Sequence, residues 1–176
     1  GILRRIGLIH NRATPDHTGI LTRVLKTTLE MLHDRGYTDL TPVSSLNQLL
    51  VNMEEGTPII ESSDVVVYFH AEDRVGVKQL RLWGESNKEV VIVVSLEGPT
   101  SFTRRESDCQ FPRVQFFTFR DLSVNITHHQ MVSKHEKWTA PLEYDTNGHH
   151  DLPVLYSNDK IAQYYNYSVG NVVRIT

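Results

Sequence analysis

Three short runs of apolar residues limit most strongly how this chain of 176 residues can fold. Residues 65–69 and 90–94 contain only valine, isoleucine and aromatic side chains, and a third run spans residues 114–119. Each run has the length of one strand, and an unbroken apolar strand is typical of a sheet that helices cover on both faces. Helical patterns alternate with these runs, which predicts an α/β fold around a mostly parallel sheet.

The helical patterns have clear start and stop signals. Apolar residues recur at helical spacing from Thr18 to Arg35, and Gly36 supplies the left-handed exit. A second helix is expected after Ser44 or Ser45, either of which can cap it, and before Gly56. A third helix is predicted between the first two apolar runs.

Charge and cysteine content exclude several classes of protein. The formal net charge is −3, so the whole molecule is not a basic nucleic-acid binder, and any DNA contact must come from a local cluster. Cys109 is the only cysteine, which rules out an internal disulfide. The chain has nine histidines, but structural zinc sites usually need thiolates, so we expect no metal and no other cofactor. The apolar runs are much shorter than the roughly 20 residues that cross a bilayer.

The character of the sequence changes near residues 120–127, where polar residues replace the strand and helix patterns. We therefore expect an N-terminal domain of residues 1–122 and a small C-terminal domain of residues 123–176.

The C-terminal domain has dense local signals. Asn158 or Asp159 can cap a short helix, because either side chain accepts from the open amides of a first turn. That helix would carry Ile161 and Tyr164 on one face. Gly170 precedes a β-branched run that predicts a strand at residues 172–175, so this domain is expected to be α+β.

Five segments carry a pattern that extends along the chain. One is residues 152–175, which begins with Leu-Pro, contains Asp159 and ends with Gly-x-Val-Val-x-Ile. The other four lie upstream and are residues 32–37 (Leu-His-Asp-Arg-Gly-Tyr), 67–78 (ending Val-Gly-Val-Lys), 91–101 (ending Gly-Pro-Thr-Ser) and 125–135 (Asn-Ile-Thr-His-His-Gln-Met-Val-Ser-Lys-His). In this order they resemble the common fifth subunit of nuclear RNA polymerases and its archaeal counterpart. Each match is weak alone, but together they cover most of the chain.

The resemblance implies a nuclease-like α/β jaw domain followed by an assembly domain. It implies a non-catalytic subunit of a DNA-dependent RNA polymerase that docks on the largest subunit and its neighbours. The jaw domain would form part of the lower jaw and make weak phosphate contacts with downstream duplex DNA, away from any membrane. The implied location is the nucleus, the nucleolus if the chain serves polymerase I alone, or a cytoplasmic factory if the polymerase is viral.

Several positions depart from the family pattern. Ser133 and Lys160 stand where the family has proline, and the proline of the Thr-Pro-Ser-Ala turn is displaced to Pro99. Family members also continue beyond the strand that here ends near Thr176, so we expect the assembly domain to be incomplete at its end. These departures favour a divergent paralogue or a viral version.

The candidate DNA contacts lie at residues 98–113 and in the preceding helix. Arginines around a turn of small polar residues can hold backbone phosphates without reading sequence, and the resemblance puts this turn on the lower jaw. The alternative is a solvated loop that Glu97, Glu106 and Asp108 balance. The candidate DNA-proximal residues are Lys78, Thr100, Ser101, Arg104 and Arg105.

The candidate subunit interface rests on the resemblance alone, and exposed histidines or ordinary core packing are the alternatives. Its residues are His129, His135, Tyr164, Val172, Val173, Arg174 and Ile175.

Two other functions remain open. Asp64 before a strand and Glu72-Asp73-Arg74 after it are loosely similar to the Asp…Glu-x-Lys sites of metal-dependent nucleases, although an arginine is a poor base. A free-standing protein-interaction adaptor with the same fold is the second alternative.

Overall fold

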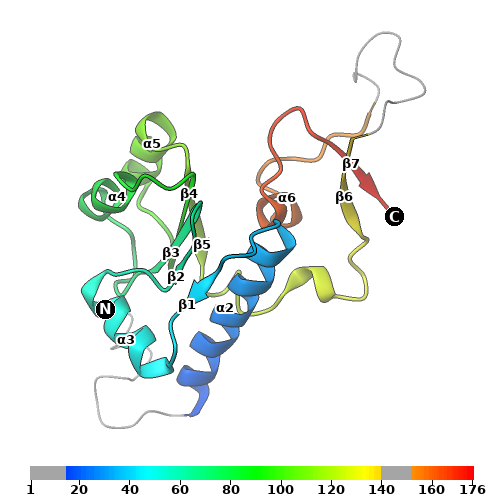
Figure 1. The fold of residues 1–176 in the computed structure, drawn as a ribbon. Helices are drawn as coiled ribbons and strands as arrows, with labels where there is room; N and C mark the ends of the chain where they lie inside the picture. Colours follow the sequence, from blue (N-terminus) through cyan, green and yellow to red (C-terminus); the bar gives the residue numbers. More distant parts are fainter. Residues whose placement is uncertain (1–14, 140–151) are drawn as a thin grey trace. The chain divides into compact units, whose positions relative to one another are not determined.

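The computed structural model describes residues 15–139 and 152–176 (Figure 1). The chain divides into two compact units, the N-terminal unit (residues 1–124) and the C-terminal unit (residues 125–176). The elements of the N-terminal unit are α2 (Pro15–Asp34), β1 (Thr41–Pro42), α3 (Leu46–Glu55), β2 (Ile60–Glu61), β3 (Val65–Phe69), α4 (Val77–Gly84), β4 (Val90–Ser95), α5 (Ser101–Gln110) and β5 (Val114–Thr118).

One five-stranded sheet, in the order β1-β2-β3-β4-β5, organises the N-terminal unit. Strands β3, β4 and β5 are parallel, with Val67 beside Ile92 and Val93 beside Phe116. The predicted α/β fold and its three parallel strands are confirmed. The prediction of a mostly parallel sheet needs correction, because β1 and β2 join the edge of β3 in antiparallel orientation and make the sheet mixed.

The antiparallel edge follows from a tight turn between β2 and β3. The Ser62 N–H donates to the Val65 carbonyl at 2.9 Å, and Ser62 Oγ accepts from the N–H groups of Asp64 and Val65. A serine side chain that satisfies the amides of a turn stabilises a reversal of the chain within a few residues. The next strand therefore returns beside β2 without a crossover helix.

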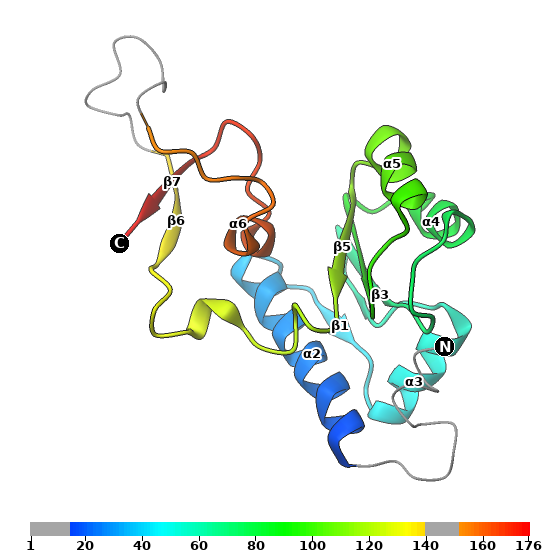
Figure 2. The same cartoon turned by 180° about the vertical axis from the view of Figure 1, so that it is seen from behind.

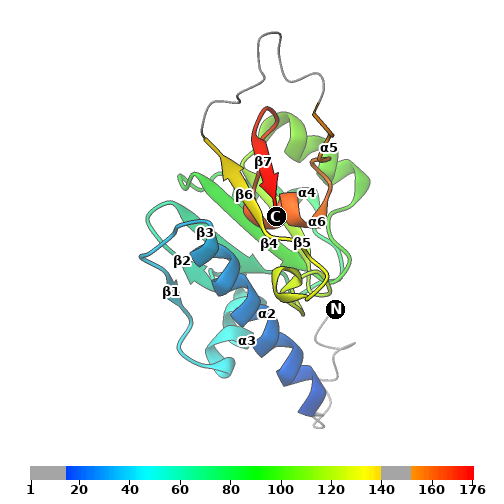
Figure 3. The same cartoon turned by 90° about the vertical axis from the view of Figure 1, so that its right-hand side faces the viewer.

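Helices cover the sheet from both sides. Helices α4 and α5 lie along one face and α2 lies along the other (Figures 1, 2 and 3). On the α4 side, Leu80 and Trp83 pack with Val66, Val91 and Val93 in a continuous buried cluster. Burial on both faces explains why the strand sequences show no polar alternation.

The predicted helix boundaries agree with local chemistry. Gly36 follows α2 with φ of 98°, and Gly56 follows α3 with φ of 70°. These positive φ values are strained for residues with a Cβ and accommodate glycine readily. At the start of α3, Ser45 Oγ accepts the N–H of Gln48, as the capping prediction requires.

The expectation of a turn or loop at residues 98–113 is wrong, because most of that segment is helix α5. Thr100 caps it by accepting the N–H of Thr103 at 3.2 Å. Thr103 and Ser107 are its buried residues, so the inward face consists of small hydroxyl side chains instead of apolar ones. An apolar helical pattern is therefore absent from the sequence of this helix.

The C-terminal unit is smaller. Its described elements are the 3₁₀ turn η1 (Ile126–His128), β6 (His135–Trp138), α6 (Lys160–Tyr165) and β7 (Val172–Ile175). Strands β6 and β7 pair in antiparallel orientation, with His135 opposite Ile175. Helix α6 and strand β7 were predicted, whereas β6 lies in a segment that the sequence presents as polar and irregular.

Candidate functional site

The candidate DNA-proximal residues lie at the starts of two neighbouring helices. Strands β3 and β4 are parallel neighbours, so the loops that follow them lead into α4 and α5 at the same edge of the sheet. The loops are joined directly, because the Val75 N–H donates to the Gly98 carbonyl at 3.1 Å and the Thr100 N–H donates to the Val75 carbonyl at 3.2 Å. The structure thus brings Lys78, Thr100 and Ser101, which are distant in sequence, into one region.

The start of α4 presents open amides next to a positive charge. Gly76 precedes α4 and supplies no side-chain cap, and Lys78 is an exposed residue of the first turn. The amides of a first turn carry a partial positive charge and favour anions. The Thr100 hydroxyl already caps α5 and contacts Thr103 Oγ1 at 2.8 Å, so it holds the helix in place more than it offers a contact.

The two arginines differ in how they are held. Arg104 and Arg105 are both exposed on α5. The Arg104 guanidinium carbon lies 5.5 Å from the centroid of the Phe116 ring, so a neighbouring strand orients this side chain. Arg105 has no aromatic contact of this kind among the described residues.

Two of the three acidic residues expected to balance the positive charge of this segment form ion pairs with other arginines. Glu97 pairs with Arg74 at 2.8 Å, and Glu106 pairs with Arg81 at 2.7 Å. Both acids therefore meet arginines other than Arg104 and Arg105. This arrangement leaves the exposed surface of α5 more positive than the sequence composition suggests.

The candidate interface residues occupy several environments in the C-terminal unit. Tyr164 is buried, and its hydroxyl oxygen accepts from Asn125 Nδ2 at 3.1 Å. His129 is exposed and accepts the Met131 N–H at its Nδ1, while the Nδ1–H of His135 donates to the Ser133 carbonyl at 2.7 Å.

Strand β7 holds the remaining candidates, Val172, Val173, Arg174 and Ile175, of which the last two are exposed. Arg174 lies across the ribbon from Glu136, 2.6 Å from its carboxylate, and stacks over the Trp138 ring at 4.8 Å. Hydrogen bonds from Lys134 and then Arg174 lower the pKa of Glu136 from 4.5 to about 2. Glu136 and Arg174 are direct partners in the pairing of β6 with β7, so their ion pair links the two strands.

A further set of exposed apolar side chains was missed by sequence reasoning. Met131 is 85% exposed and Val169 is 97% exposed. Both lie beside turn-forming residues and outside any helical or strand pattern, which is the signal that could have identified them. The same unit also exposes Leu152, Val154 and Tyr156, in addition to the candidate Ile175.

The nuclease hypothesis fails on geometry. The Asp64 carbonyl accepts from Val90 at the start of β4, whereas the Asp73 carbonyl accepts from Glu97 beyond its end. The two acidic positions are therefore separated by the length of strand β3, about 16 Å, and cannot share one metal ion.

Across residues 15–139 and 152–176, no three His, Cys, Asp or Glu side chains are arranged to hold a metal. Within the same ranges, no helix is both long and apolar enough to span a membrane.

Comparison with known proteins decides the family. Residues 124–176 match the family model described as RNA polymerase Rpb5, C-terminal domain. The chain is 30% identical to the subunit rpabc1 of DNA-directed RNA polymerases I, II and III from Dictyostelium discoideum, over 88% of each chain. It belongs to the RPABC1 (Rpb5) family. The RPABC1 subunits of Caenorhabditis briggsae and Caenorhabditis elegans are each 26% identical, over 88% of this chain and 87% of theirs.

Membership of the RPABC1 family confirms the resemblance read from the five motifs. The family model covers the C-terminal unit, and the RPABC1 relatives extend the similarity through most of the N-terminal unit.

Proposed function

We propose that this chain is a non-catalytic, structural subunit of a DNA-dependent RNA polymerase. The observation that carries the proposal is the similarity to RPABC1 subunits over 88% of the chain, a share that includes residues of both units. Such a protein works in the nucleus, where its catalytic partners transcribe DNA. The domain boundary we propose lies at residues 122–123, close to the division between the two compact units.

The C-terminal unit is proposed to dock on the largest polymerase subunit. Its described part buries only Ile161, Ala162 and Tyr164 among its apolar residues, while it exposes several large ones. A small unit with so few buried side chains gains little from its own core, and a two-stranded ribbon is marginal on its own. Exposed apolar side chains gathered in such a unit favour a surface that a partner covers.

The docking surface is proposed to include the candidates His129 and His135, the exposed end of β7, and the apolar residues that the structure adds. Met131 and Val169 offer the largest exposed fractions, and neither contributes to the core. Burial of such side chains contributes roughly 25 cal/mol per Å² of apolar area. Tyr164 acts from inside the unit by holding α6 in position.

The N-terminal unit is proposed to form part of the lower jaw beside downstream DNA. Lys78 is exposed in the uncapped first turn of α4, and Arg104 and Arg105 are exposed on α5. Cations and amides of this kind hold phosphate oxygens without reading base sequence. The contribution to DNA binding is therefore weak and sensitive to salt.

Affinity purification of the tagged chain from its own cells tests the proposal. The two large catalytic subunits of a polymerase should be recovered in stoichiometric amounts. Recovery of regulatory proteins alone would overturn the polymerase model and favour the adaptor. Met131→Asp should lower the recovery of the large subunits. Leu82→Asp, which places the same charge at another exposed apolar residue, on α4, should leave it unchanged.

The DNA contact is tested separately on the assembled polymerase. The double variant Arg104→Ala with Arg105→Ala should assemble normally and dissociate from DNA at lower salt. Each lost phosphate contact should reduce the slope of log K against log salt by about 0.9. Arg23→Ala with Lys26→Ala removes the same charge from the exposed face of α2 and serves as the control. An unchanged slope in the first variant would remove α5 from the DNA side.

A further inference from the structure

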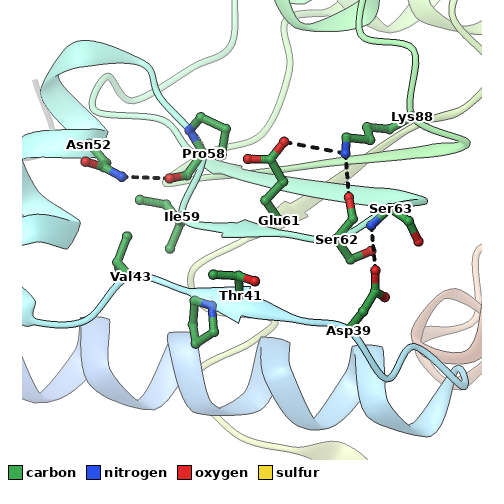
Figure 4. A pocket seen from close by; sticks show the side chains of 11 residues that line it. Asp39, Thr41, Val43, Asn52, Pro58, Ile59, Glu61, Ser62, Ser63 and Lys88 are labelled. Carbon is green, nitrogen blue, oxygen red and sulfur yellow. Dashed lines mark hydrogen bonds and ion pairs between the residues drawn. The ribbon is translucent and has the colours of Figure 1, made fainter.

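The first two strands of the sheet carry a groove that is open to solvent. The groove lies between residues 39–43, residues 58–63 and Lys88, and its volume is about 650 Å³ (Figure 4). Glu61 pairs with Val66, whose side chain belongs to the buried cluster beneath α4, so the groove lies on the α4 side of the sheet. Helix α4 packs on the middle of that face, and α3 borders the groove at this corner, where Asn52 Nδ2 donates to the Pro58 carbonyl at 2.7 Å (Figure 4).

The strand register places the groove residues in an ordered row. Thr41 lies opposite Glu61, and the Val43 N–H donates to the Ile59 carbonyl at 2.9 Å. Alternate residues of a strand share one face, so Asp39, Thr41 and Val43 point to the same side over about 13 Å. Val43 and Pro58 make one end of the row apolar, and the other end carries carboxylates.

The carboxylate end has a net negative charge. Asp39 accepts the Ser63 N–H at 2.8 Å, and this bond, together with the Ser63 hydroxyl, lowers the pKa of Asp39. Lys88 is the cation lining the groove, and its ammonium group donates to the Ser62 carbonyl and lies 3.5 Å from Glu61 (Figure 4). The groove therefore holds the carboxylates of Asp39 and Glu61 and a single ammonium group, which already contacts the Ser62 carbonyl and Glu61.

The outer edge of β1 is unsuited to the addition of another strand. Pro42 is one of the two residues of β1 and has no N–H to donate. An occupant of the groove therefore lies across the exposed face and is recognised by its side chains.

We propose that this groove docks an extended, basic segment of a partner protein. An apolar side chain of the segment lies over Val43 and Pro58, and an arginine two residues away lies between Asp39 and Glu61. The spacing fits because residues two apart in an extended chain are about 6.8 Å apart, which is also the spacing between alternate groove residues. The charge of the groove selects a basic occupant over a neutral or acidic one. This proposal stands apart from the polymerase function and from the C-terminal docking surface.

Titration of the labelled full-length chain with a short peptide, followed by NMR, tests this assignment. The probe is acetyl-Gly-Ile-Ser-Arg-Gly-amide, and the matched peptides carry Gln or Glu in place of Arg, or Gly in place of Ile. The Arg peptide should give saturable shifts at the amides of Asp39, Thr41, Glu61 and Ser63. The Gln and Gly peptides should bind several-fold more weakly, and the Glu peptide should give no saturable shift.

The double variant Asp39→Asn with Glu61→Gln should weaken binding of the Arg peptide by about fivefold, the loss expected for two exposed charge pairs. The amide of Asn keeps an oxygen for the Ser63 N–H, so the turn should survive. Asp108→Asn with Glu85→Gln removes equal charge from exposed positions outside the groove and should bind as the native chain does. Equal binding of the Arg and Glu peptides, or equal loss in both double variants, would overturn the proposal. Shifts at the groove that appear on raising the protein concentration without peptide would do the same, because they would identify a second copy of this chain as the occupant.

Discussion

Loss of the Asp159 side chain should loosen α6 without unfolding the rest of the chain. Asp159 Oδ1 accepts the N–H of Ile161 at 2.8 Å and that of Ala162 at 3.4 Å. The first is a good hydrogen bond and the second is long, so the cap amounts to little more than one full bond. Replacement of such a cap by alanine costs about 1 kcal/mol, in the middle of the known range of roughly 0.5–2 kcal/mol.

Hydrogen exchange in the C-terminal unit measures this effect directly. The amide of Gln163 donates to the Asp159 carbonyl at 2.9 Å, and that of Tyr167 donates to the Ala162 carbonyl at 3.0 Å. A loss of about 1 kcal/mol in Asp159→Ala should make these amides exchange about fivefold faster. Amides of β4 provide an internal reference in the N-terminal unit and should keep their rates.

Asp159→Asn separates capping from charge. Asparagine keeps the accepting oxygen and loses the negative charge that favours a helix start, so it should exchange only slightly faster than the native chain. Equal acceleration in the Asn and Ala variants would show that charge, and not the hydrogen bond, stabilises α6. Native exchange rates in Asp159→Ala would refute the capping argument altogether.

Two other predictions concern the same unit. Lys160→Pro should stabilise it by about 0.5 kcal/mol in urea unfolding, because the first helical position needs no amide and the Asp159 ψ of 137° already suits a following proline. A loss of stability in this variant would mean that Lys160 makes a contact worth more than the gain in rigidity. Native Glu136 should support stability above pH 4.5 and lose its contribution as the pH falls towards its folded pKa of about 2, since its pKa is lower in the folded chain. Acid unfolding followed by tryptophan fluorescence should show this window, and Glu136→Gln should abolish it.

The long strands and the capped helices could be predicted because local sequence determines them. Residues 65–69 and 90–94 are mostly buried because nearly all their side chains are apolar. Ser45 begins α3 by accepting a first-turn N–H, and Gly56 ends it with a left-handed backbone conformation. The short strands β1 and β2 could not be predicted in this way. Each has two residues, and their pairing depends on the strand β3 that they reach after folding.

The candidate sites were only partly accessible from sequence. The approach of Lys78 to Thr100 follows from the parallel order of the strands, which the apolar runs predict. The burial of Tyr164 depends on tertiary packing and is not revealed by its residue type, whereas the exposure of Met131 has only the weak signal of its position outside any helical or strand pattern. Helix α5 was missed because its buried face consists of hydroxyl side chains, which a hydrophobic pattern does not detect.

The two hydrogen bonds of Val75 link the loop before α4 to the loop before α5, so a mutation in one loop affects which mutations the other loop tolerates. A residue inserted in either loop would shift the partner loop through the bonds to Gly98 and Thr100. Substitutions on the two sides of this junction should therefore be non-additive, with a change tolerated only alongside its counterpart. Variation among relatives at residues 75–76 and 98–100 is best compared as pairs, because the displaced Pro99 of this chain pairs directly with Val75.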